Sequence, residues 1–210
     1  MGVDPAVILA SSHGRRSIDV LRLYDPARAN LDCECPCACS AIDALILSPD
    51  VLEMEGRIPR EFGNEAEEIP GARKLLDSLN DRDVPWAVVT SGTKPLVNGW
   101  LEVLKLAHPK VMVTAESVDN GKPDPACYLL GRSSLGLDAE TDLIVFEDAP
   151  AGIKAGKAAG FRVVGLTTSH PLEQVVAAGA DWIVQDLTKV TLVAFDNGKI
   201  SITIKDSAIL

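Results

Sequence analysis

The sequence predicts an α/β fold, in which a parallel sheet with helices on both faces follows a small helical domain. Two observations carry this prediction. From residue 71 onward, short apolar runs of strand length alternate with segments whose apolar residues recur at helical spacing, and this alternation is typical of a parallel sheet. Before residue 71, helix-like segments occur without a clear strand. We therefore divide the chain into a helical domain at 1–70 and an α/β domain at 71–210.

The composition is that of a folded protein with an acidic surface. The 210 residues suffice for one full domain and a smaller second piece. Hydrophobic residues make up 47% and charged residues 24%, which excludes wholesale disorder and a collagen-like chain. The formal net charge of -10 disfavours nucleic acid and anionic lipid as partners. No apolar run reaches the roughly 18 residues of a spanning helix, and no signal peptide is evident, so we expect a cytoplasmic protein.

Three segments of the helical domain have helical spacing: Pro5 to Ser11, Arg16 to Tyr24 and Pro49 to Arg60. Between the last two lies a cysteine-rich insertion at about residues 31–50, which fits neither neighbour. Its cysteines alternate from Cys33 to Cys39, and the run lacks the paired spacing of a structural zinc site. We interpret it as a reduced surface segment, with zinc or copper binding as the alternative.

In the α/β domain, helices and strands are expected in alternation. The expected strands are at residues 85–90, 111–113, 143–146, 162–166 and 182–184, and the expected helices are at 71–83, within 94–106, after Pro125, at 149–159 and near 172–178. Two further strands, at 191–195 and 199–204, flank the turn Asp196-Asn197-Gly198 and are typical of a β-hairpin. We expect this hairpin to close the chain.

Polar residues that follow the expected strands are the candidates for function, because ligands of open parallel sheets bind beyond the carboxyl ends of the strands. Thr90-Ser91-Gly92-Thr93 could bind a phosphate oxygen at a helix N-terminus, or could serve as an ordinary helix cap. Glu147 and Asp148 could hold a divalent cation, or could cap the next helix.

Lys122 lies in the stiff turn Gly121-Lys122-Pro123-Asp124-Pro125 before an expected helix. It could direct its ammonium at an anion, or it could be a solvated turn lysine. Because parallel strands share one direction, we expect Lys122 and Thr90 to face one cleft at the same edge of the sheet. In a chain with a complete sheet, we also expect Lys122→Ala to leave the melting temperature nearly unchanged, since the role of Lys122 is to meet charge and not to pack.

Together these segments are far more specific than any one alone. The order T-S-G-T, G-K-P-D-P and F-E-D-A-P-A-G, at residues 90–93, 121–125 and 146–152, resembles motifs II, III and IV of the haloacid dehalogenase-like (HAD) phosphohydrolases. With S-H-G-R-R-S-I-D-V-L at residues 12–21, the chain is most similar to the sugar- and polyol-phosphate phosphatases of that superfamily, the glycerol-3-phosphate and 2-deoxyglucose-6-phosphate phosphatase group. The similarity covers nearly the whole chain apart from the insertion.

The resemblance implies a HAD-type parallel sheet with a helical cap, and a Mg²⁺-dependent phosphatase that hydrolyses phosphate monoesters through an aspartyl-phosphate. Thr90 and the backbone N–H groups of Ser91 and Gly92 would bind the transferring phosphoryl group. Lys122 would neutralise the phosphoryl oxygens.

The same resemblance assigns a metal site and a substrate-selecting cap. Glu147 and Asp148 would hold Mg²⁺. His13, Arg15 and Arg16 match the cap segment that in relatives closes over the site, and the planar fork of arginine suits an anionic or polyol substrate. The expected partner is a small phosphorylated sugar or polyol.

One motif of the family is absent from the sequence. No D-x-D-G-T occurs, although in the family this motif I carries the nucleophilic aspartate on a central first strand, between the strands that end here at Thr90 and Asp148. Ala6 to Ala10 and Ala44 to Leu47 could replace that strand, but neither ends in the needed carboxylates. We therefore expect an incomplete gene product without its central strand. A catalytically inactive remnant that binds anions without turnover is the alternative to the phosphatase.

Overall fold

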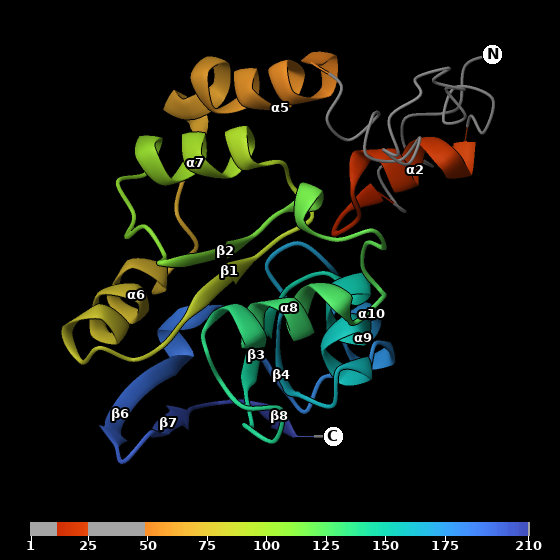
Figure 1. The fold of residues 1–210 in the computed structure, drawn as a ribbon. Helices are drawn as coiled ribbons and strands as arrows, with labels where there is room; N and C mark the ends of the chain where they lie inside the picture. Colours follow the sequence, from red (N-terminus) through yellow and green to blue (C-terminus); the bar gives the residue numbers. More distant parts are fainter. Residues whose placement is uncertain (1–11, 25–48, 210) are drawn as a thin grey trace.

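The structure is a computed structural model that describes residues 12–24 and 49–209 (Figure 1). Its N-terminal part contains helix α2 (Ser17–Tyr24) and helix α5 (Pro49–Phe62), followed by the short helix η1 (Gly63–Glu65). The two longer helices confirm two of the three segments predicted for the helical domain. The third segment, the cysteine run and the two substitute strand segments lie outside the described residues. The domain boundary at residue 70 stays a prediction.

The predicted parallel strands are all present, but they form two separate sheets. Strands β1 (Ala87–Val89) and β2 (Val111–Val113) pair in one sheet. In the other, β3 (Ile144–Glu147), β4 (Arg162–Leu166) and β5 (Trp182–Val184) pair in parallel in this order. The unpredicted short strand β8 (Ala208–Ile209) pairs antiparallel with β5. Among the described residues, no strand joins β1 to β3.

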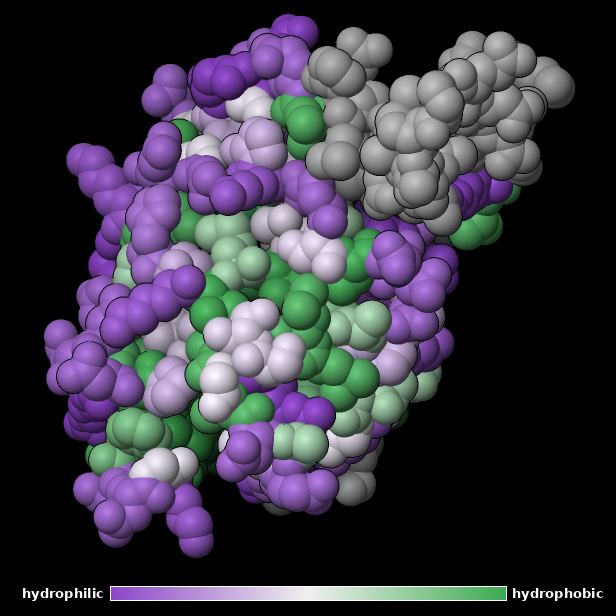
Figure 2. Space-filling view, viewed as in Figure 1, coloured by the Kyte–Doolittle hydropathy of each residue, from purple (hydrophilic) through white to green (hydrophobic). Residues whose placement is uncertain are grey.

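The division leaves the strands beside it less buried than the strand inside the larger sheet. All three residues of β1 are half-buried, as are Ile144 and Phe146 of β3. In β4 the last four residues are fully buried, as expected for a strand covered on both faces. Figure 2 shows apolar surface in the middle of the face on which β1 and β2 lie. The division falls between β1 and β3, which are the strands expected from the sequence on either side of the missing central strand.

The helices lie between the strands along the chain, as predicted. In order they are α6 (Ala72–Asp81), α7 (Lys94–Val103), η2 (Ala115–Ser117), α8 (Ala126–Ser134), α9 (Pro150–Ala158), α10 (Leu172–Ala177) and η3 (Leu187–Lys189). Helix α8 packs on β1 and β2, α9 packs on β3 and β4, and α8 contacts α9, so these two helices hold the sheets together. Helix α5 packs on α7 beyond the smaller sheet (Figure 1). None of the described helices is long and apolar enough to cross a membrane.

The core consists of two apolar clusters, one on each face of the larger sheet. Val163 and Val164 are adjacent in β4, point to opposite faces and are completely buried, one in each cluster. The first cluster lies under α8, α9 and α10. The second joins α6 to the strands β6 (Val190–Asp196) and β7 (Lys199–Ile204). One face is therefore covered by a helix together with a hairpin, and not by helices alone as predicted.

The β6–β7 hairpin confirms the turn prediction. Asn197 and Gly198 both have positive φ, at 50° and 73°, which is the backbone of the two-residue turns that asparagine and glycine favour. The strands pair antiparallel outward from Asp196 and Lys199. The hairpin is not the last element, because the chain continues to β8.

Candidate active site

A cleft of about 860 Å³ opens at the carboxyl ends of β1 and β3. Its walls come from the loop after β1, the end of β3, the segment at residues 12–20, and α5. All but one of the site residues predicted from the sequence line this cleft, namely His13, Arg15, Thr90, Ser91, Gly92, Lys122, Glu147 and Asp148. The exception is Arg16. The shared direction of the parallel strands therefore gathers the strand-end residues at one edge, as expected.

The loop after β1 presents hydrogen-bond donors to the cleft. Thr90 Oγ1 accepts a hydrogen bond from the backbone N–H of Gly92 (3.1 Å), which leaves its own proton free for another acceptor. Ser91 Oγ donates to the carbonyl oxygen of Gly14 (2.9 Å) and so ties this loop to the segment before α2. The backbone N–H of Ser91 has no hydrogen-bond acceptor among the described residues. The loop therefore offers a hydroxyl and an N–H group to an anion.

Lys122 reaches the cleft from the turn before α8. Its ammonium donates to the carbonyl oxygen of Val89 (3.1 Å) and to Glu147 Oε1, and it lies 5.0 Å from the centre of the Tyr128 ring. The side chain is only 5% exposed. Lys122 therefore bridges the ends of β1 and β3 across the division between the sheets, and it is not a solvated turn lysine.

Glu147 is the buried partner of this lysine. Its Oε1 accepts hydrogen bonds from Lys122 and from the hydroxyl of Tyr128 (2.7 Å). Its Oε2 accepts the backbone N–H groups of Asp148 and Ala149, both at 3.1 Å. Burial, together with the adjacent Glu147 carboxylate, raises the pKa of Tyr128, which therefore stays a donor. Because both oxygens of Glu147 have protein donors, this arrangement positions Lys122 and leaves no oxygen free for the metal-ligand role that the sequence suggested.

Asp148 faces the cleft with its side chain 35% exposed. Its Oδ2 accepts a hydrogen bond from the hydroxyl of Ser169 and lies 3.7 Å from His13 Nε2. Burial alone would raise the pKa of Asp148, but the interactions with His13 and Ser169 outweigh burial and hold this pKa at about 2. The contact with Asp148 also raises the pKa of His13. An ionised carboxylate is thus present at the cleft.

Ser169 and His170 belong to the same site, although the sequence reading missed them. The rings of His170 and His13 meet edge to face with their centres 5.0 Å apart, and Nδ1 of His170 lies 3.1 Å from the carbonyl oxygen of Asp148. Both residues lie in the polar turn at residues 167–170, directly after β4. The strand-end rule that identified the other site residues would have found them too.

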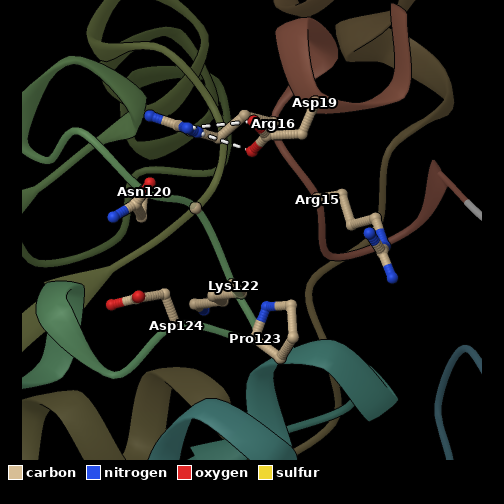
Figure 3. A pocket seen from close by; sticks show the side chains of 8 residues that line it. Arg15, Arg16, Asp19, Asn120, Lys122, Pro123 and Asp124 are labelled. Atoms are coloured by element: carbon tan, nitrogen blue, oxygen red, sulfur yellow. Dashed lines mark hydrogen bonds and ion pairs between the residues drawn. The ribbon is translucent and has the colours of Figure 1, made fainter. Parts of the chain in front are cut away.

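The two arginines of the cap segment point in different directions (Figure 3). Arg15 lines the cleft, and none of the described residues pairs with its guanidinium. Arg16 is 2% exposed and forms an ion pair with Asp19 beside a neighbouring pocket of about 570 Å³. Of the cap residues predicted to contact substrate, His13 and Arg15 are therefore placed to do so, and Arg16 is not.

Asp148 could supply one ligand to a Mg²⁺ ion at the cleft, although the described residues offer no complete set of side-chain ligands. Within residues 12–24 and 49–209, no cluster of three His, Cys, Asp or Glu side chains could hold a metal ion. Mg²⁺ is commonly held by one or two carboxylates, with waters and substrate phosphate oxygens completing its shell. Asp148, which is ionised and faces the cleft, can supply one such carboxylate.

Comparison with known proteins identifies the family. The sequence profile of haloacid dehalogenase-like hydrolases matches residues 50–166. Glycerol-1-phosphate phosphohydrolase 1 of Saccharomyces cerevisiae is 36% identical, over 87% of this chain and 69% of the relative. 2-Deoxyglucose-6-phosphate phosphatase 1 of the same yeast is 38% identical, over 98% of this chain and 84% of the relative. The crystal structure of CbbY from Rhodobacter sphaeroides in complex with phosphate shares the fold, with a TM-score of 0.65 and 20% identity over 90% of this chain and 81% of that one. The chain therefore belongs to the haloacid dehalogenase-like hydrolase family.

Proposed function

We propose that this chain is a Mg²⁺-dependent phosphatase that acts on phosphate monoesters of small sugars or polyols. The observation that carries the proposal is the meeting of the loop at Thr90, the ammonium of Lys122 and the carboxylate of Asp148 at one cleft. Hydrogen-bond donors, a cation and a carboxylate are the groups needed to hold a phosphoryl group together with a divalent metal. The yeast relatives, whose names give glycerol-1-phosphate and 2-deoxyglucose-6-phosphate as substrates, support this substrate class.

The phosphoryl group is held by the loop after β1 and by Lys122. The hydroxyl of Thr90 and the N–H of Ser91 donate to its oxygens. The ammonium of Lys122 is already fixed between Val89 and Glu147, so it meets the phosphoryl charge without rearrangement. Donors and charges that are fixed before the reaction stabilise developing negative charge better than mobile ones do.

Asp148 and the cap segment complete the site. Mg²⁺ held by Asp148 would reduce the repulsion between an anionic nucleophile and the phosphate ester. Arg15 and His13 lie on the cleft wall contributed by the cap segment, where they donate to the hydroxyl groups of the sugar or polyol. The guanidinium of Arg15 has no protein partner in the described part of the chain, so it can bind a ligand without breaking an existing contact.

A protein that binds phosphate esters without turnover is the second candidate. The sequence contains no D-x-D-G-T. Among the described residues of the cleft, Glu55 and Glu147 both accept hydrogen bonds at each carboxylate oxygen. With Asp148 assigned to the metal, this part of the chain offers no further carboxylate to attack phosphorus. Affinity for phosphate would then remain while hydrolysis is lost.

Binding and turnover separate the two candidates. Isothermal titration with inorganic phosphate and with glycerol-1-phosphate, each with and without Mg²⁺, measures binding. Release of phosphate from glycerol-1-phosphate and from 2-deoxyglucose-6-phosphate measures turnover. The variants are Thr90→Val, which removes one donor, and Asp148→Asn, which removes the charge. Arg162→Gln is the control, because Arg162 pairs with Asp142 at the start of β4, away from the cleft.

The phosphatase proposal expects phosphate release that Asp148→Asn abolishes and Thr90→Val lowers by about 100-fold. The second candidate expects binding that Thr90→Val weakens, without release by any form of the protein. If the wild-type chain binds neither phosphate nor glycerol-1-phosphate, both candidates are wrong.

A further inference from the structure

Arg16 uses all of its hydrogen-bonding capacity inside the protein. Nε and Nη2 donate to the two carboxylate oxygens of Asp19, at 2.7 and 2.9 Å. Nη1 donates to the carbonyl oxygens of Val118 (2.7 Å) and Ala115 (3.4 Å), and Nη2 also donates to that of Asp119 (2.9 Å). A guanidinium carries five N–H donors, so none remains for a ligand. Arg16 therefore joins the start of α2 to a loop about 100 residues further along the chain.

This ion pair packs against the residue that precedes Lys122. A Cβ added to Gly121 would overlap Asp19 Oδ2 and would lie 2.6 Å from Arg16 Nε. Figure 3 shows Arg16 and Asp19 beside the backbone that leads through Asn120 to Lys122. The absence of a side chain at Gly121 is thus what allows the ion pair to lie directly on this backbone.

Arg16 supplies the hydrogen-bond donors for two carbonyl oxygens of this loop. Among the described residues, no backbone N–H donates to the carbonyl oxygen of Val118 or of Asp119. Val118 is half-buried and Asp119 is exposed, so losing the donor is costly mainly for the carbonyl group of Val118. The guanidinium thus holds two consecutive carbonyl groups of the loop that leads into the turn of Lys122.

We propose that Arg16 is a positioning residue: together with Asp19 and Gly121 it fixes the turn that holds the Lys122 ammonium at the cleft. The same anchor restrains Arg15, which immediately precedes Arg16, and His13, which lies three residues before it. Both the cap side and the lysine side of the cleft are thus set by one guanidinium. The proposal rests on the proposed function in one respect, namely that Lys122 contacts a phosphate anion.

The test compares Arg16→Lys with Gly121→Ala. Arg16→Lys keeps the positive charge but loses the planar fork that reaches three carbonyl oxygens and a carboxylate. Gly121→Ala keeps Arg16 but pushes the ion pair away from the turn. Arg162→Gln is the control, because the side chain of that arginine is 49% exposed and binds only Asp142 in the described part of the chain.

Two measurements are made on each full-length variant, at a temperature at which circular dichroism shows it folded. The first is the affinity for inorganic phosphate by titration calorimetry. The second is the ¹⁵Nζ resonance of Lys122, since a buried ammonium with fixed acceptors gives a distinct, slowly exchanging signal. The resonance is assigned by its absence from the spectrum of Lys122→Met. We expect both variants to bind phosphate about tenfold more weakly or worse, the value of one hydrogen bond to a charged group. We also expect both variants to shift or lose the Lys122 resonance, while the control changes neither.

A purely structural role for Arg16 predicts a different result. Melting temperatures would fall, but the folded variants would bind phosphate as the wild type does and keep the Lys122 resonance, and this outcome would overturn the proposal. If Arg16→Lys does not fold, Gly121→Ala and Asp19→Asn decide by the same two measurements. If the wild type binds no phosphate, the proposed function is wrong, and the Lys122 resonance alone decides whether Arg16 positions this side chain.

Discussion

Replacing Lys122 by methionine should destabilise the protein strongly, because the lysine is half of a buried ion pair. Lys122 is 5% exposed and its partner Glu147 is 9% exposed. Removing one partner of a buried pair leaves the other charge without its counter-charge, which costs about 3–5 kcal/mol. For a chain of this length, 1 kcal/mol lowers the melting temperature by about 2–4 °C, so Lys122→Met should melt about 6–20 °C lower. The sequence alone suggested nearly no change, because it gave no sign that this turn residue is buried.

Thermal unfolding of four proteins tests the origin of this loss. They are the wild type, Lys122→Met, Glu147→Gln and the double variant, each followed by circular dichroism. The double variant should recover most of the stability lost in Lys122→Met, since it leaves no unpaired charge in the interior. Arg162→Gln serves as a separate control, because it breaks an exposed pair and should cost no more than about 1 kcal/mol.

Two outcomes would refute the reasoning. If Lys122→Met melts as high as the wild type, the ammonium is not a buried structural charge. If the double variant melts no higher than Lys122→Met, the two side chains are not energetically coupled, and the loss comes from packing of the lysine stem.

The remaining predictions concern the neighbours of this pair. Tyr128→Phe should destabilise the protein by about 1–3 kcal/mol in chemical denaturation, because Glu147 Oε1 loses a buried donor; equal stability would contradict the hydrogen bond. Because the pKa of Asp148 is lowered from 3.8 to about 2, the stability it contributes is fully present above about pH 4 and is lost as the pH falls toward 2, so Asp148→Asn should flatten the acid limb of the stability curve. In the same variant the pKa of His13, measured by NMR titration, should fall because the carboxylate that raises it most is gone; an unchanged pKa would exclude the contact. Gly152→Ala should lower the melting temperature, since a Cβ there would overlap the carboxylate of Glu147, and wild-type melting would contradict this packing.

Local patterns were enough to predict most of the fold. The apolar run before Thr90 and the turn at Asn197 and Gly198 fix their strands and hairpin through neighbouring residues, and the structure has both. The strand-end rule placed Thr90 and Asp148 at one cleft because parallel strands share a direction. The same rule also applies to Ser169, which follows the correctly predicted strand β4 but was not among the predicted site residues.

The parts that the sequence did not reveal depend on contacts between distant segments. Arg16 binds carbonyl groups about 100 residues away. The neighbouring sequence therefore does not distinguish it from Arg15, which lines the cleft. Tyr128 occupies an ordinary core position of α8, and its hydroxyl finds Glu147 only once β3 is packed against that helix. Likewise, apolar periodicity shows that a sheet face is covered but not whether a helix or the β6–β7 hairpin covers it.

The division between the two sheets gives the smaller sheet a weaker attachment to the molecule than a strand within the larger sheet has. Strands β1 and β2 exchange no ladder hydrogen bonds with β3 in the described structure, so they are attached through side-chain packing and the Lys122 bridge alone. Val113 of β2 packs in the same apolar cluster as Val163, whereas Val164 lies in the cluster on the other face, so opening of β1 and β2 would expose part of the first cluster and leave Val164 covered. Native-state amide exchange would then show a lower opening free energy for Met112 than for Val164. A ligand held jointly by the loop after β1 and by the end of β3 would join the two units, and would raise the protection of the smaller one in particular.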